Sequence, residues 1–141
     1  MPKTRERATA NPPAGHRRRA ATLADVRELP VPPDAPEPLP EPDAADLRLE
    51  TVLGALSDPL RLEIVQRLLL EREDFDHTCG WFGFDRPKSS LTHHFRALRE
   101  AGLIRQRQYG LERRSHVRTE DLEDRFPGLL ALVVAWTPPD D

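Results

Sequence analysis

Cysteine is almost absent from this chain of 141 residues, which contains only Cys79. A single thiol cannot form an internal disulfide and cannot supply the paired cysteines of a structural zinc site. We therefore expect a fold that is stabilised by packing alone. We interpret Cys79 as a small buried thiol rather than a redox switch, because acidic residues at positions 73, 74 and 76 disfavour a reactive thiolate.

Long apolar runs are also missing. The longest spans residues 129–136, whereas a membrane-spanning helix needs roughly 20 apolar residues. The first residues are charged and are followed by Arg, Pro and Ala instead of an apolar stretch. We therefore expect neither a transmembrane helix nor a secretory signal, and the expected location is the cytoplasm.

Charge is nearly balanced over the whole chain, with a formal net charge of -3, but it is unevenly distributed. Residues 86–118 contain nine basic and two acidic side chains, which leaves that segment strongly positive and the rest of the chain acidic. Such segregation indicates that one face of the molecule meets an anionic partner while the other faces stay solvated.

Proline is concentrated at the N-terminus, where the first 42 residues hold ten of the fifteen prolines. Proline has no amide hydrogen and pushes the preceding residue toward extended geometry. We therefore predict that residues 1–43 form a disordered tail with a polyproline-like spacer. The basic group at residues 16–19 is interpreted as part of a solvated tail in preference to an arm that contacts DNA.

Residues 44–137 show the spacing of a folded domain of several helices. Apolar residues recur at helical intervals over residues 49–56. Asp58 followed by Pro59 predicts a helix start, because the carboxylate accepts orphan amides and proline at the first position loses no hydrogen bond. This helix should run to about Arg72. A third helix should open after Asp85 and end at Gly102.

Two short strands should follow, over residues 103–109 and 112–118, joined at Gly110 in a hairpin. Thr119 is a predicted helix cap, and a last apolar helix should run from near Gly128 to Trp136. The predicted fold class is therefore mostly α with a small β-hairpin.

The third helix and the hairpin together favour binding to a DNA duplex. A helix that carries small hydroxyls, a histidine and arginines fits the major groove, and arginines on the hairpin would lie along the phosphate backbone. The basic Arg99 lies on the same helix. The candidate DNA-binding residues are Lys88, Ser89, Ser90, Thr92, His93, Arg96, Arg107, Arg113 and Arg114.

Two segments of the sequence resemble the ArsR/SmtB-type winged helix-turn-helix regulators. Residues 56–65 (LSDPLRLEIV) are similar to that family's second helix, and residues 88–104 (KSSLTHHFRALREAGLI) to its recognition helix. The resemblance covers residues 44–118. It implies a symmetric homodimer, formed by the first and last helices, that binds a double-stranded DNA operator and represses transcription.

The implied dimer interface draws on apolar residues of both terminal helices. The last helix has more apolar surface than a small monomer can cover. The candidate interface residues are Leu49, Val52, Leu53, Leu129, Leu132, Val133 and Trp136.

We expect no metal site and no cofactor. His77 and Cys79 offer two ligands per subunit, whereas a soft-metal site needs three or four, and residues 119–141 contain neither His nor Cys. His94 is expected at the edge of the core, and His116 on the solvent or phosphate side of the hairpin. The aromatics at positions 75, 81, 82 and 84 are interpreted as core packing in preference to an effector pocket.

Two other function classes compete with DNA binding as interpretations of the sequence. A winged-helix module that binds mainly a protein partner is the alternative. An enzyme is not expected, because the sequence shows no nucleophile–base pair, no paired carboxylates and no glycine-rich phosphate loop. Whether a regulator of this kind represses or activates, and which effector it senses, stays open.

Overall fold

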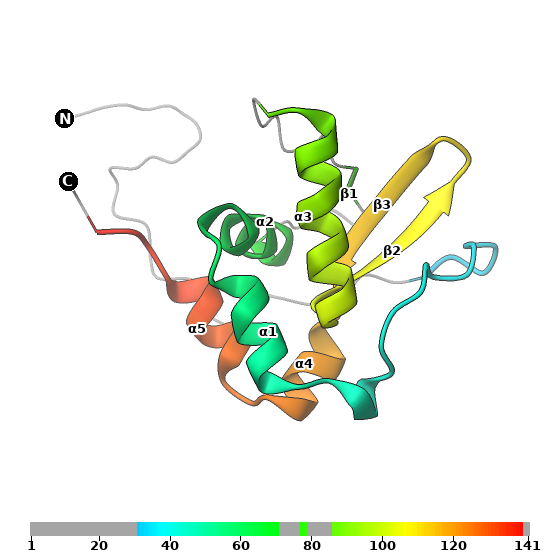
Figure 1. Cartoon of the computed structure of the whole chain (residues 1–141). Coiled ribbons are helices and arrows are strands. Elements are labelled where there is room, and N and C mark those ends of the chain that lie inside the picture. The colour runs from blue at the N-terminus through cyan, green and yellow to red at the C-terminus, as the bar shows by residue number, and fades with distance from the viewer. Residues whose placement is uncertain (1–30, 71–76, 79–85, 140–141) are drawn as a thin grey trace.

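A computed structural model describes residues 31–70, 77–78 and 86–139. In this part of the chain, helices and a small antiparallel sheet share one core (Figure 1). The elements in chain order are a 3-10 helix η3 (Ala44–Asp46), α1 (Leu49–Leu56), α2 (Pro59–Leu70), β1 (His77–Thr78), α3 (Lys88–Ala101), β2 (Ile104–Tyr109), β3 (Glu112–Val117), α4 (Thr119–Arg125) and α5 (Leu129–Ala135).

The predicted fold class, mostly α with a small β-hairpin, is confirmed at this level. The hairpin pairs Gln106 with Ser115 and turns at Gly110, whose φ of 63° is a conformation that favours glycine. The sheet also has a third strand that the sequence did not predict, because β1 pairs with β3 in the order β1-β3-β2. This leaves β2 at one edge of the sheet.

The start of α2 follows the predicted capping. The Asp58 Oδ1 atom accepts the backbone amides of Leu60 at 2.8 Å and Arg61 at 3.1 Å. These two amides have no acceptor within the helix, so the side chain satisfies them. The predicted extension of α2 to Arg72 lies beyond the described residues.

The end of α3 is also as predicted. Gly102 follows the helix with φ 91°, and its amide donates to the Arg99 carbonyl at 3.0 Å. A Cβ at position 102 would collide with the Leu47 side chain, so glycine is needed both for the turn and for close packing.

The cap of α4 differs from the prediction by one residue. Arg118 holds the N-cap position, and Thr119 is the first residue of the helix. The Thr119 hydroxyl donates to the Val117 carbonyl at 3.4 Å instead of capping an amide.

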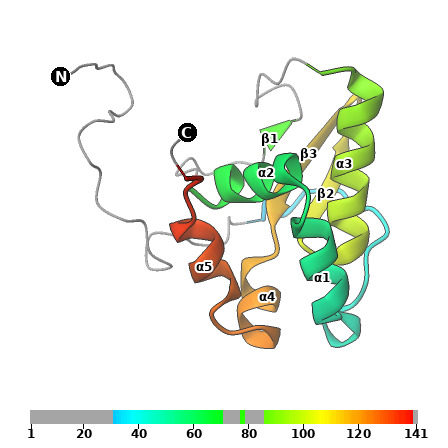
Figure 2. The ribbon, with the colours of Figure 1, turned by 60° about the vertical axis from the view of Figure 1, so that its left-hand side comes forward.

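The core lies between α2, α3 and the two terminal helices. Ile64 and Val65 of α2 pack with Phe95 and Leu98 of α3, all of them buried. Figures 1 and 2 place α5 on the opposite side of α2 from α3. The outer face of α3 and the exposed face of α5 are therefore separate surfaces of one domain.

The boundary of the packed chain lies earlier than predicted. The sequence predicts residues 36–43 to be part of the tail, but this segment runs along β2 and past the end of α3 (Figure 1). We call residues 36–42 the strap. The predicted boundary is wrong because an extended, proline-rich segment has the composition of a spacer, and the sequence does not show that this one pairs with β2. Residues 1–30 of the predicted tail lie outside the described part of the chain.

Candidate nucleic-acid interface

Helix α3 has one buried and one exposed row of side chains. Leu91, Phe95 and Leu98 recur at intervals of four and three residues and are buried in the core. They fix the orientation of the helix. The opposite row carries the candidates predicted on this helix; Ser90 is partly buried, and the exposed members are Lys88, Ser89, Thr92, His93 and Arg96.

The two histidines of α3 lie in different environments. His93 is exposed, and the partly buried His94 faces the start of α2, with the two rings 5.7 Å apart. Burial lowers the pKa of His94 below its ordinary value of 6.5, and the charge of Arg61 adds to this, while the Asp58 carboxylate opposes it. His94 thus sits at the edge of the core, as predicted.

Asp58 is the carboxylate whose charge acts on this histidine. Burial raises the pKa of Asp58, but the backbone hydrogen bonds from Arg61 and Leu60, together with the charges of His94 and Arg61, hold the pKa below its ordinary 3.8. The cap of α2 is therefore a carboxylate at neutral pH.

Two hairpin arginines are partly exposed and are held by neighbours on the same hairpin. The Arg113 Nε atom donates to Gln108 Oε1 at 2.9 Å. The Arg114 guanidinium lies 4.3 Å from the centre of the Tyr109 ring and 3.0 Å from a Glu112 carboxylate oxygen. These contacts orient both cations without burying them.

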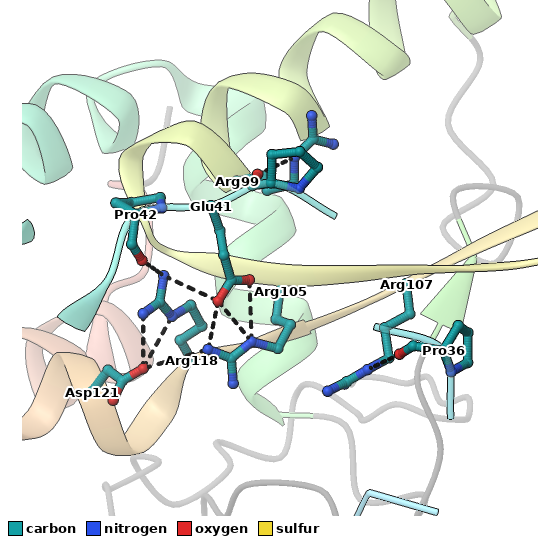
Figure 3. Close-up of polar contacts among 9 residues, drawn as sticks. Pro36, Glu41, Pro42, Arg99, Arg105, Arg107, Arg118 and Asp121 are labelled. Atoms are coloured by element: carbon teal, nitrogen blue, oxygen red, sulfur yellow. Dashed lines mark hydrogen bonds and ion pairs between the residues drawn. The ribbon is translucent and has the colours of Figure 1, made fainter. Parts of the chain in front are cut away.

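Arg107 does not lie on the exposed surface where the sequence predicted it. It was predicted to contact DNA, but it is 8% exposed and its Nε donates to the Pro36 carbonyl at 2.8 Å (Figure 3). His116 is also buried, where a solvated side chain was expected. Alternation along a strand does not reveal which face the rest of the chain covers, and the strap covers β2 in this molecule.

Further arginines contact the strap at sites that the sequence did not indicate. Arg105 of β2 meets the Glu41 carboxylate in a bidentate pair, with contacts of 2.6, 3.0 and 3.1 Å (Figure 3). Arg118 donates to Asp121 Oδ2 at 2.9 Å and lies 3.7 Å from Glu41. The only signal in the sequence was the strict alternation of proline over residues 36–42.

The predicted dimer residues fall into two groups. Leu49, Leu53, Leu132 and Trp136 are between 45% and 69% exposed, and Leu129 is partly buried. The prediction that Val52 and Val133 lie in a dimer interface is wrong, because both are buried in the core of the same chain. Helical spacing predicts that an apolar residue faces inward without saying whether it faces this chain or another.

Several predictions fall on residues that the structure does not describe, namely those on Cys79 and on the aromatics between positions 75 and 84. Within the described ranges, no group of three or more His, Cys, Asp or Glu side chains could hold a metal ion. None of the helices in these ranges has the length and apolar character needed to cross a membrane. A scan against protein-family models finds none that matches the chain, and a search of curated proteins finds no match.

Proposed function

We propose that this chain is a winged helix-turn-helix regulator that binds double-stranded DNA as a homodimer in the cytoplasm and represses transcription. The observation that carries the proposal is the outer row of α3. It presents hydroxyls, His93 and Arg96 to solvent while three large apolar side chains hold the opposite face in the core. An exposed polar row on a rigid helix suits the major groove.

The α3 side chains have two roles in this proposal. His93 and Arg96 read base edges or adjacent phosphates, while Lys88 and Ser89 approach the phosphates that border the groove. The amino end of α3 adds a favourable dipole for an anion.

The hairpin has a different role. Arg113 and Arg114 lie along the sugar-phosphate backbone, where they add affinity but little sequence preference. A basic helix next to a basic hairpin gives the continuous cationic surface that duplex DNA requires.

The test compares two arginine substitutions by fluorescence anisotropy. An operator is first selected from a random duplex library with the wild-type protein. Arg96→Ala should weaken operator binding about tenfold and random-duplex binding less, because each good base contact contributes roughly 1–3 kcal/mol. Arg48→Ala is the matched control, since Arg48 is exposed at the start of α1 and pairs with Glu50.

The salt dependence separates DNA binding from the alternative. Affinity for a duplex should fall by orders of magnitude as salt rises through the physiological range, since bound phosphates release counterions. If no duplex is selected and binding stays undetectable at low salt, the proposed function is wrong, and a module for protein partners becomes the better interpretation.

A further inference from the structure

The strap is an extended segment that binds the edge of the sheet through its backbone. The Leu39 amide donates to the Gln106 carbonyl at 2.8 Å, and Pro38 pairs with Arg107 as an antiparallel bridge. Every second strap residue is a proline, which lacks an amide hydrogen. The side of the strap that faces away from β2 thus offers acceptors without donors, so that no further strand can add there.

The strap uses its proline carbonyls to hold arginine side chains. Guanidinium groups carry five N–H donors and no acceptor. Here three of them come from α3, from β2 and from the residue after β3, and each donates to a carbonyl of the strap. The pairs are Arg107 with Pro36 at 2.8 Å, Arg99 with Pro40 at 3.1 Å and Arg118 with Pro42 at 2.8 Å (Figure 3).

Glu41 adds a carboxylate of the strap to this network. It forms the bidentate pair with Arg105 and approaches Arg118, so that the two guanidinium groups share Glu41 and Asp121. Asp121 alone would leave two cations beside one carboxylate. Glu41 therefore balances the charge of this cluster only while the strap is in place.

The arginines held by the strap continue the proposed DNA surface. Arg99 follows the exposed Arg96 by one helical turn, and like charge from Arg113 on the hairpin acts on Arg99. Arg107 lies directly opposite Arg114 in the register of the hairpin. On α3 and on the hairpin alike, some arginines are therefore open to solvent and others are covered by the strap.

We infer that the strap is an intramolecular competitor of DNA phosphates. Docked, it keeps Arg99, Arg105 and Arg107 from the duplex and limits binding to the outer row of α3 and the outer hairpin arginines. Released, it adds phosphate-binding cations that carry no base preference, so the docked strap raises the ratio of specific to non-specific affinity. This inference rests on the proposed function.

The strap can be released without opening the core. None of residues 36–42 belongs to the buried core; they are partly buried or exposed. They are held by a small number of hydrogen bonds and ion pairs, of which the Glu41–Arg105 pair is largely shielded from solvent, and not by large apolar side chains of the core. Local release at a smaller free-energy cost than global unfolding is expected for such a segment.

The experiment uses three full-length variants and a random-sequence 30-base-pair duplex. Glu41→Gln removes the shared carboxylate, and Leu39→Pro removes the amide that binds β2 without changing the charge. Glu37→Gln is the control, because it makes the same charge change at an exposed position of the same strap. Amide hydrogen exchange of residue 39, measured by NMR without DNA, reports docking in the wild type, Glu41→Gln and Glu37→Gln.

We expect Glu41→Gln to lose protection at the Leu39 amide and to bind the random duplex more tightly at low salt. The slope of log affinity against log salt should steepen by about one for each freed arginine. Leu39→Pro should show the same steepening, whereas Glu37→Gln should match the wild type in both measurements.

The outcomes separate this inference from the proposed function. If duplex binding is intact but the slope is the same in Glu41→Gln, Leu39→Pro and wild type, the strap does not withhold cations and the inference is wrong while DNA binding stands. An unprotected Leu39 amide in the wild type also overturns the inference. If neither the wild type nor any variant binds DNA, the proposed function itself fails.

Discussion

At the residue scale, Asp58 shows how one side chain fixes the start of a helix. Its carboxylate accepts two backbone amides of α2, so Asp58→Ala leaves both without that partner. We expect a loss of about 1 kcal/mol in the free energy of unfolding, measured by urea denaturation. Asp124→Ala, at an exposed position of α4, should change it by less than about 0.5 kcal/mol. Equal losses in both variants would contradict the capping role.

His94 makes stability depend on pH in a direction that its environment sets. Burial holds the pKa of the folded state below 6.5, so the unfolded chain binds a proton first as the pH falls. The contribution of neutral His94 to the free energy of unfolding is complete above about pH 7. It is lost as the pH falls through 6.5 toward the lower pKa of the folded state. We expect His94→Gln to show a shallower loss of stability between pH 7 and pH 5 than the wild type.

The measurement is urea unfolding of both proteins at a series of pH values. The difference between them isolates His94 from other groups that titrate in the same range. Above pH 7.5 the difference should be constant, because neither state of His94 takes up a proton there. A wild-type curve that rises as the pH falls would show that the sign is wrong.

At the element scale, local sequence signals predicted where helices and turns begin and end. They did not predict which distant segments pack beside them. The Asp58–Pro59 start, the Gly102 stop and the hairpin at Gly110 all depend on backbone chemistry within a few residues, and all are as predicted. The pairing of β1 with β3 joins segments far apart in the sequence, so no local pattern could predict it.

For the candidate interface too, the sequence predicted local features but not tertiary contacts. The inner and outer rows of α3 follow from helical spacing and are where the sequence placed them. The burial of Arg107 was not predictable, because it depends on a segment about 70 residues away in the chain. Burial of Val52 depends in the same way on partners that periodicity does not name.

The turn after α3 supplies a prediction at this scale. Gly102→Ala places a Cβ against Leu47 in a backbone with φ 91°, so we expect a loss of about 1–3 kcal/mol in the free energy of unfolding. Gly54→Ala is the matched control, since Gly54 lies within α1 and a Cβ there would meet nothing within 4 Å. This second change should stabilise the protein by about 0.5–1 kcal/mol. A thermal melt that moves both variants in one direction would contradict the argument.

At the scale of the whole molecule, the domain separates two kinds of exposed surface. Polar and basic side chains lie on α3 and the hairpin, while apolar side chains of α1 and α5 remain exposed elsewhere. A small protein rarely leaves several large apolar side chains on its terminal helices without a partner. The separation allows the proposed dimer contact to be tested without touching the proposed DNA surface.

Leu132 is the residue of choice for that test. It lies in the middle of α5 and is 69% exposed, so replacement by Asp disturbs little of the chain's own core. In a symmetric dimer the change places two carboxylates in one apolar contact, which is costly. We expect Leu132→Asp to shift the mass in sedimentation from about twice 16.1 kDa to 16.1 kDa at micromolar concentration. Each 1.4 kcal/mol lost weakens the dimer tenfold.

Leu111→Asp is the matched control for the mass measurement. Leu111 is a fully exposed leucine in the turn between β2 and β3, and Figure 1 shows this end of the hairpin well away from α5. The same substitution there adds the same charge outside the proposed contact. This variant should keep the mass of the wild type. Leu132→Asp should also bind the selected operator far more weakly than the wild type, because a single half-site forfeits the gain from linked binding. A wild type that sediments at 16.1 kDa, or a Leu132→Asp variant that stays dimeric, would show that the exposed face of α5 is not where two copies meet.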